Sequence, residues 1–187
     1  VKGTNRYIGG LAGSSFKGTI TNVGVTGEIT STSNYVGGLI GYWSSTRMGT
    51  ITNSYSTAKV TGVSYVGGLV GQSYGIITNA YSTGEVTGTS YVGGIVGENA
   101  GDIRNTYSTA KVTGTSYVGG LVGRIGVISN VSGTVANSYW ALDINNQKTS
   151  DGGEGKIFSA MLRQNTYKNW DFETVWQIEE GATLPYL

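Results

Sequence analysis

Apolar and polar residues alternate with glycine in one arrangement that recurs along most of the chain. A block of the form Tyr-[Val/Ile]-Gly-Gly-[Leu/Ile]-[Val/Ile/Ala]-Gly occurs five times, at residues 7–13, 35–41, 65–71, 91–97 and 117–123. Successive copies start 28, 30, 26 and 26 residues apart. Self-similarity at a fixed period of this length is typical of stacked repeats, in which each unit packs on its neighbours. The pattern therefore predicts a repeat architecture.

A second block follows each of these copies. It reads Ile51-Thr-Asn53-Ser-Tyr55 in one unit and continues as Ser-Thr-[Ala/Gly]-[Lys/Glu]-Val-Thr-Gly in the regular units. Runs rich in Val, Ile, Thr and Tyr, separated by Gly, Ser and Asn, indicate two or three short strands per unit. No helical periodicity precedes about residue 156.

Strand alternation assigns faces to the second block. It places Thr57, Lys59 and Thr61 outward, and Ala58 and Val60 inward. A unit of about 26 residues is long enough for one coil of a β-solenoid, whereas a propeller blade usually needs more than about 40. We therefore predict an all-β fold, a β-solenoid (β-helix) of about five coils of 26–30 residues.

Stacked coils place equivalent residues above one another, so the repeats predict ladders of like side chains. Two aromatic ladders and one amide ladder are expected: Tyr35, Tyr65, Tyr91 and Tyr117; Tyr55, Tyr81 and Tyr107; and Asn22, Asn53, Asn79 and Asn105. Charges alternate in sign at one further position, which holds Glu28, Lys59, Glu85 and Lys111. We interpret all of these rows as structural. The glycine pairs, such as Gly67-Gly68, indicate close backbone approach or a bulged corner.

The repeat weakens after Asn137-Ser-Tyr139-Trp140, which divides the chain into a solenoid at 1–139 and a C-terminal cap at 140–187. A polar loop passes through residues 151–155, and Ser159 is expected to N-cap a short helix that ends at Arg163. Large apolar side chains are expected to cover the last coil: Trp170, Phe172, Val175, Trp176 and Ile178.

The opposite end differs, since Val1 leads almost directly into the first repeat, with no secretion signal and no apolar run long enough to span a membrane. The sequence is therefore expected to be a mature fragment or an excised piece, whose exposed first coil invites upstream domains or end-to-end assembly.

Composition narrows the chemistry. The chain has no His and no Cys, which removes the commonest general base, the thiol nucleophile and thiolate zinc sites. Its eleven carboxylates are dispersed, and seven lie beyond residue 139. The residues near Asp143 (Asp143-Ile-Asn145-Asn-Gln-Lys) resemble a calcium loop only in part, because the Gly at its sixth place is missing. A polar turn is favoured there, and no catalytic, cofactor-binding or metal-ligating residue is predicted.

Charge is nearly balanced but unevenly placed. Residues 1–139 carry eight Lys/Arg and four Asp/Glu, or +4, and residues 140–187 carry four and seven, or −3, which gives the net +1. A nucleic-acid-binding protein usually shows a clustered basic stripe, so neither nucleic acid nor membrane insertion is expected.

The repeated Tyr-Val-Gly-Gly-Leu-Val-Gly, followed by Ile-Thr-Asn-Ser-Tyr, resembles the GLUG-motif repeats of bacterial cell-surface and secreted proteins. These include adhesin-like proteins and non-catalytic regions of some immunoglobulin A peptidases. The resemblance implies a secreted or surface location and no active site. It is weaker in the first unit, where Val23-Gly24 replaces Ser-Tyr, and in the irregular stretch 128–135 of the fifth.

Two functional classes follow. The chain is either a non-enzymatic repeat module of an adhesin-like protein, a rigid spacer or a surface that binds protein or glycan, or a structural subunit of an extracellular filament that binds copies of itself through solenoid edges. A third hypothesis, ice binding, rests on the threonine rows Thr57/Thr83/Thr109 and Thr61/Thr87/Thr113, but charged residues lie between those rows.

Overall fold

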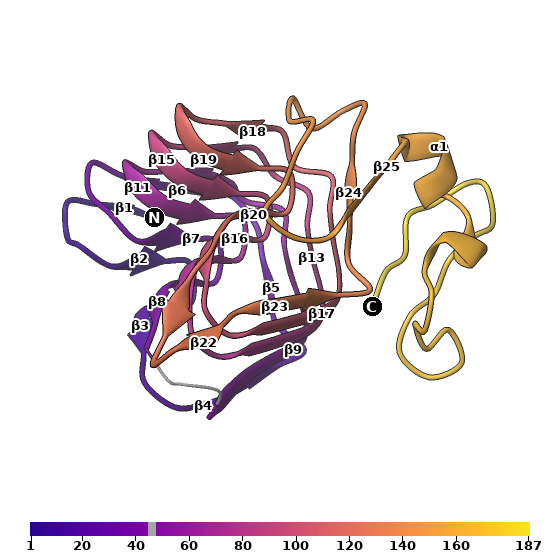
Figure 1. Cartoon of the computed structure of the whole chain (residues 1–187), viewed down its shortest axis with the longest axis horizontal. Helices are drawn as coiled ribbons and strands as arrows, with labels where there is room; N and C mark the ends of the chain where they lie inside the picture. The colour runs from indigo at the N-terminus through magenta and orange to yellow at the C-terminus, as the bar shows by residue number, and fades with distance from the viewer. Residues whose placement is uncertain (45–47) are drawn as a thin grey trace.

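Parallel strands stack into a β-solenoid, as the sequence predicted (Figure 1). The computed structural model describes residues 1–44 and 48–187. The first four coils each run through four sheets, called B, C, D and A in chain order, with one strand or strand pair in each; the described residues of the fifth coil form no strand in sheet A. The sequence indicated two or three strands per coil. The difference arises because the Gly-Gly pair bends the Tyr-Val-Gly-Gly block into two strands.

Sheets A and B form one half of the cross-section. The strands of sheet A are β1 (Lys2–Gly3), β6 (Glu28–Ser31), β10 (Lys59–Thr61), β14 (Val86–Thr87) and β18 (Val112–Thr113). The strands of sheet B are β2 (Ile8–Gly9), β7 (Val36–Gly37), β11 (Ser64–Gly67), β15 (Ser90–Gly93) and β19 (Ser116–Gly119).

Sheets C and D form the other half. The strands of sheet C are β3 (Ala12–Ser15), β8 (Ile40–Trp43), β12 (Val70–Ser73), β16 (Val96–Asn99) and β20 (Val122–Ile125). The strands of sheet D are β4 (Gly18–Thr21), β5 (Gly24–Val25), β9 (Gly49–Ser56), β13 (Ile76–Ser82), β17 (Asp102–Ser108), β23 (Thr134–Ala136), β24 (Tyr139–Ala141) and β25 (Glu154–Lys156).

Register is constant from coil to coil. In sheet D, Ile77 pairs with Ile51 on one side and with Ile103 on the other, and Tyr81 pairs with Tyr55 and Tyr107. Like residues therefore stack on like, as the ladder prediction requires. The predicted faces of the second block are also confirmed, since Ala58 and Val60 are fully buried and Lys59 is exposed.

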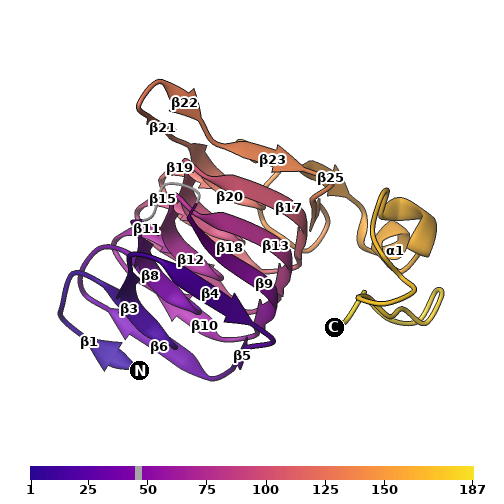
Figure 2. The ribbon, with the colours of Figure 1, turned by 90° about the horizontal axis from the view of Figure 1, so that it is seen from below.

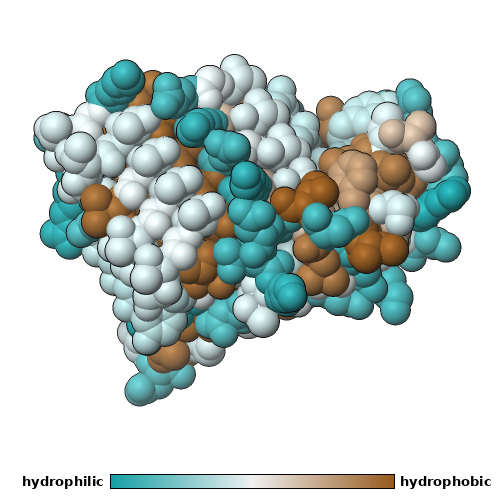
Figure 3. Space-filling model, turned by 90° about the horizontal axis from the view of Figure 1, so that it is seen from above, coloured by the Kyte–Doolittle hydropathy of each residue, from teal (hydrophilic) through white to brown (hydrophobic). Residues whose placement is uncertain are grey.

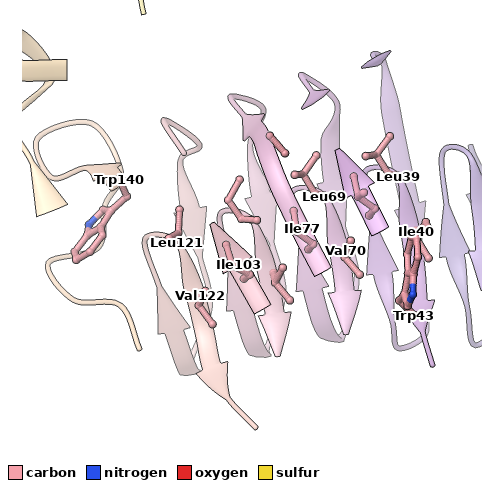
Figure 4. Close-up of a cluster of buried hydrophobic side chains, with 14 residues drawn as sticks. Leu39, Ile40, Trp43, Leu69, Val70, Ile77, Ile103, Leu121, Val122 and Trp140 are labelled. Carbon is pink, nitrogen blue, oxygen red and sulfur yellow. The ribbon is translucent and has the colours of Figure 1, made fainter. Parts of the chain in front are cut away.

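Two apolar cores lie inside the coils. One contains residues such as Leu69, Ile77 and Ile103 of the C and D side (Figure 4), and the other contains Val60 and Val66 of the A and B side. Between them the cross-section narrows: a Cβ atom at Gly68 would lie 2.2 Å from Ser82 Oγ and 2.1 Å from the carbonyl oxygen of Gly94. The Gly-Gly pairs are thus required by close approach, as predicted.

The two ends of the stack differ. In every sheet, β1, β2, β3 or β4 lies at the outer position, so the edge of the first coil is unpaired among the residues that the structure describes. At the other end, Trp140 stands beyond Leu121 (Figure 4) and the loop after it lies across the last coil, where Asn145 Nδ2 donates to the carbonyl oxygen of Gly120 at 2.9 Å.

The C-terminal segment corrects two expectations. Its aromatic residues do not lie across the end of the stack. They pack on the outward tyrosines of sheet D, with Trp170 and Trp176 6.3 and 6.2 Å from the ring of Tyr107, at the side of the solenoid (Figure 2). Figure 3 shows apolar residues gathered on this segment.

The predicted short helix is present but lies two residues earlier in the chain than expected. Helix α1 spans Phe158–Met161 and is followed by a 3-10 turn, η1, at Gln164–Thr166. Ser159 lies inside α1 and does not cap it. Instead, Asp143 Oδ1 accepts a hydrogen bond from the Phe158 backbone N–H at 2.7 Å. Among the described residues, no helix has the length and apolar character needed to cross a membrane.

The irregular part of the fifth unit forms an antiparallel hairpin, β21 (Val127–Ile128) and β22 (Val131–Ser132), that projects from the stack (Figure 2). Ser129 and Asn130 both have positive φ, at 49° and 63°, as a tight two-residue turn requires. The solenoid resumes at β23.

Candidate binding surface at an inward corner

The tyrosines of the first block stand at an inward corner, within or directly before the strands of sheet B. Tyr35, Tyr65, Tyr91 and Tyr117 all have φ between 52° and 60°, a left-handed conformation that bulky residues rarely adopt. The glycine six residues later allows the bend: a Cβ atom at Gly97 would lie only 2.5 Å from the carbonyl oxygen of Tyr91. The closing Gly of the block is therefore a steric requirement.

These four tyrosines form one stacked row, here called the corner ladder. Ring centroids are 4.6 Å apart for Tyr35 and Tyr65, 4.5 Å for Tyr65 and Tyr91, and 4.9 Å for Tyr91 and Tyr117, with interplanar angles of 2–6°. Tyr7 extends the row with a tilted ring, 5.3 Å from Tyr35. Because inner rings cover one another's faces, the ladder offers mainly ring edges and hydroxyls to a partner.

A second outward row on sheet C faces the corner ladder. Register aligns Ser14, Tyr42, Gln72, Glu98 and Arg124 in successive coils. This row, called the variable row, differs in every coil. Gln72 Nε2 donates to Glu98 Oε1 at 2.9 Å, and Arg124 Nη1 lies 3.9 Å from Glu98 Oε2 and donates to Tyr91 Oη at 3.3 Å.

The electrostatics of the corner reflect partial burial. Burial, followed by the negative charge of Glu98, raises the pKa of Tyr65. Burial raises the pKa of Tyr74, beside Tyr42, to about 12. The hydrogen bond to Tyr91 raises the pKa of Arg124, which is therefore a permanent cation. The corner thus presents phenols, the carboxylate of Glu98 and two guanidinium groups, Arg124 near one end of the ladder and Arg6, which donates to Tyr35 Oη at 3.3 Å, near the other.

The C-terminal end of the corner contains a cavity of about 310 Å³. A further coil would continue the sheets here, but residues 149–151 take its place: Ser150 Oγ accepts from the backbone N–H of Val122 at 2.9 Å, and Asp151 N–H donates to the Val122 carbonyl at 3.1 Å. The cavity lies between this loop and the last ring of the ladder, Tyr117, with Arg124 in its wall.

The other predicted rows have structural roles. Tyr55, Tyr81 and Tyr107 stack at 4.9 and 5.1 Å, and the row ends above Gly24, where a Cβ atom would lie 2.4 Å from the Tyr55 ring. Tyr107 Oη donates to the carbonyl oxygen of Pro185, which ties the C-terminal segment to the ladder. Burial raises the pKa of Tyr107 well above its usual value.

The amide ladder is confirmed in the central coils. Asn79 Nδ2 donates to Asn53 Oδ1 at 3.3 Å, and Asn105 Nδ2 donates to Asn79 Oδ1 at 3.4 Å. All four predicted residues, Asn22 included, have φ between 49° and 56°, so they turn the chain at a corner within sheet D. Asn tolerates this conformation better than most residues, which explains the amino-acid type.

The predicted charge ladder is confirmed at Lys59, which pairs with residues of opposite charge in both neighbouring coils. Lys59 Nζ lies 3.3 Å from Glu85 Oε2, and Lys59 is paired in register with Glu28. Both side chains of the ion pair are about half exposed, so the pair specifies register more than it stabilises the fold.

The Asp143 segment has a structural role. Asp143 caps α1, and Asn145 is buried against the last coil. The described residues contain no group of three His, Cys, Asp or Glu side chains placed to hold a metal ion.

Sequence analysis predicted no site, and it treated the corner ladder as purely structural. It missed the cavity because two separate segments build it: residues 117–125, inside a repeat, and residues 149–151, in a loop without repeat signal. The one available signal was that the ladder must end where the repeats end, which leaves a terminal ring without a tyrosine above it.

The repeat geometry agrees with comparison to known proteins. The family model for the GLUG motif matches four successive segments, residues 4–30, 32–61, 62–87 and 88–113, which together make up more than half of the chain. The chain belongs to the GLUG-motif family.

Among curated proteins, the chain is similar to Halomucin of Haloquadratum walsbyi, with 44% identity over 61 residues. The match covers 32% of this chain and about 1% of that protein's length. No solved structure is significantly similar. The GLUG repeats of the family match correspond to the first four coils. The fifth coil, with its hairpin and the loop at residues 149–151, lies outside the matched segments.

Proposed function

We propose that the chain is a non-enzymatic GLUG-repeat module of a secreted or cell-surface, adhesin-like protein, in which it acts as a rigid spacer or a binding surface. The observation that carries the proposal is constant register in four parallel sheets, reinforced by stacked tyrosine and asparagine rows. Each coil is fixed to the next on every side, so the stack resists bending as a unit. Similarity to a small part of a much longer protein is consistent with a module role.

The non-enzymatic part of the proposal rests on chemistry that the sequence lacks, namely His and Cys. In addition, the carboxylate of Glu98, which lies at the corner, is engaged by Gln72 and Arg124. A general base must reach the proton that it abstracts, and the oxygens of this carboxylate are already in contact with an amide donor and a guanidinium.

Surface location is tested on intact cells that make the parent protein. Antibodies raised against the purified chain should label unpermeabilised cells or the culture medium, and external protease should remove the cell-bound label. An antibody against a cytoplasmic protein provides the matched control. Labelling that requires permeabilisation, with none in the medium, would refute the proposal.

A filament subunit, joined to its copies by strand addition at a solenoid edge, is the second candidate. Leu11 and Phe16, next to the edge of the first coil, are 49% and 67% exposed. Negative-stain electron microscopy across a concentration series separates the two functions: filaments support a subunit, and persistent single particles support a module. Filaments should disappear in a Leu11→Lys, Phe16→Lys variant and persist in Val63→Lys, which places the same charge on the flank of a central coil.

Ice binding remains a less favoured prediction. The Thr61 and Thr87 positions pair in register, but the Lys59–Glu85 ion pair stands beside them. Hydrated charges interrupt an ice-matching surface, so we expect no thermal hysteresis.

A further inference from the structure

The cavity at the end of the corner ladder has the make-up of a small-molecule site. Its volume of about 310 Å³ is at the lower end of the range of ligand pockets, roughly 300–1,000 Å³. An aromatic ring, a guanidinium, a carboxylate and two hydroxyls line it, from Tyr117, Arg124, Asp151, Thr149 and Ser150. Such a combination of one flat apolar surface with a few polar groups fixes both the position and the orientation of a ligand.

Tyr117 differs from the other rings of the ladder. Tyr65 and Tyr91 each stack on a tyrosine on both sides. Tyr117 stacks on Tyr91 alone, is 54% exposed, and lines the cavity. Its second face is therefore available for stacking, and the neighbouring ring holds it in a fixed orientation before any ligand arrives. A preoriented ring loses little conformational entropy on binding.

Arg124 is also held in place. Its guanidinium donates to Tyr91 Oη at 3.3 Å, lies 3.9 Å from the Glu98 carboxylate, and lies 5.3 Å from the centre of the Tyr117 ring. Asp151 is anchored because its Oδ2 accepts the Ile125 backbone N–H. The cavity wall thus offers a fixed donor and a fixed acceptor beside the ring.

The charges at the cavity are mixed, because the Arg124 guanidinium lies near the carboxylates of Asp151 and Glu98. An uncharged ligand with several hydroxyls can use the guanidinium as a donor and the carboxylate as an acceptor without an unpaired charge being buried.

We propose that this cavity binds a neutral hexopyranose, with the apolar C–H face of the sugar on the Tyr117 ring and its hydroxyls on Arg124 and Asp151. The inference rests on the proposed role as a binding surface, to which it adds a site and a ligand class. The spacer role does not depend on sugar binding. If the chain binds no sugar, antibodies against it should still label intact cells in the surface experiment, so the two failures can be told apart.

The test is saturation-transfer NMR on the full chain with four probes: methyl glycosides of glucose, galactose and mannose, and N-acetylglucosamine. We expect saturation transfer from at least one, with a dissociation constant on the order of 1 mM, because a small ligand stacked on one ring gains little affinity. Amide signals of Gly123 and Arg124 should shift on titration. No transfer from any of the four probes would overturn the proposal.

Variants locate the site. Tyr117→Ala should weaken binding by about tenfold, a typical contribution of one aromatic stacking contact, whereas Tyr117→Phe should retain it. Tyr7→Ala is the matched control, since it truncates the tyrosine at the opposite end of the same row. Equal weakening by Tyr7→Ala and Tyr117→Ala would contradict the assignment. If Tyr117→Ala does not fold, Arg124→Gln tests the same prediction, and unchanged binding in it, with no shift at Gly123, would also overturn the site.

Discussion

Replacement of Gly97 by alanine tests the inward corner most directly. The new Cβ atom would lie 2.5 Å from the carbonyl oxygen of Tyr91, 2.6 Å from that of Gly71 and 2.7 Å from the amide nitrogen of Val66. All three are backbone atoms, held by parallel pairing within the coil and with its neighbour. Ordinary van der Waals contact begins at about 3.4 Å, so the backbones would have to separate by roughly 0.7–0.9 Å.

The expected cost follows from two opposed effects. Overpacking in a tight interior costs about 1–3 kcal/mol, and more where backbone must move, while Gly→Ala gains about 0.5–1 kcal/mol by restricting the unfolded chain. We expect a net loss of about 2–4 kcal/mol, a large share of the ~5–15 kcal/mol that stabilises a typical domain.

Urea unfolding of the wild type and of Gly97→Ala measures this loss, with two probes because repeat stacks can unfold in segments. Gly126→Ala is the control, since its Cβ would meet only the Glu98 side chain, at 3.0 Å from Oε1. It should change stability by less than about 1 kcal/mol, as most tolerated substitutions do. If Gly97→Ala cost no more than Gly126→Ala, the steric account of the repeated glycine would be wrong.

Three further predictions follow from the same structure. Trp176→Ala should cost about 3–5 kcal/mol of local stability, release the C-terminal segment and speed tryptic cleavage at Lys168 without changing the far-ultraviolet spectrum of the solenoid; an unchanged cleavage rate contradicts it. Asn79→Ala and Asn79→Gly both lose the ladder hydrogen bonds, but alanine also strains a φ of 51°, at about 1 kcal/mol. Asn79→Ala should therefore be the less stable of the two in urea; the reverse order contradicts the prediction. The pKa of Tyr74 is raised to about 12, so the contribution of Tyr74 to the free energy of unfolding is fully present below the unfolded pKa of about 10 and falls as pH rises toward 12. Between about pH 9 and about pH 11, Tyr74→Phe should therefore lose less stability than the wild type, and an equal loss contradicts the assignment.

The sequence was sufficient to predict stacking, because a row such as Tyr55, Tyr81 and Tyr107 is in phase only if coils lie in register. It also identified the inward face of the second block, where alternation holds. The Lys59–Glu85 ion pair confirms that charges of opposite sign at equivalent repeat positions lie beside each other, as the sequence predicted.

The cross-section could not be predicted in the same way. Alternation assumes extended backbone, but the corner-ladder tyrosines and the ladder asparagines have positive φ, which changes the direction of the chain. The block that reads as one continuous strand forms two because it bends after the first glycine of the Gly-Gly pair, as between β11 and β12. The residue type at position 91 does not predict a left-handed conformation, since tyrosine rarely adopts one.

The C-terminal segment was misplaced for a different reason. Aromatic residues such as Trp170 and Trp176 indicate that an apolar surface is covered, but not which one. Two surfaces needed cover, the end of the last coil and the outward tyrosines of sheet D, which include Tyr107 and Tyr139. Trp140 and the adjoining loop occupy the first, so the later aromatics pack on the second. The start of the helix was also predicted wrongly. The prediction assigned the cap to Ser159, but Asp143, fifteen residues before Phe158, accepts the hydrogen bond from the first turn.

Geometry divides the residues of each repeat into two groups. The recurring Tyr and Gly positions are needed to build the corner, since the tyrosine rings stack on one another and the glycines leave room for the neighbouring backbone. Only positions that change from coil to coil can distinguish one ligand from another, and the variable row of Gln72, Glu98 and Arg124 is such a set beside the ladder. Gln72 is buried and the Glu98 side chain is only 13% exposed, so substitution of either should also cost stability. Substitution of Arg124, whose side chain is 44% exposed, should alter binding while leaving stability within about 1 kcal/mol. Substitutions in the recurring positions should do the opposite.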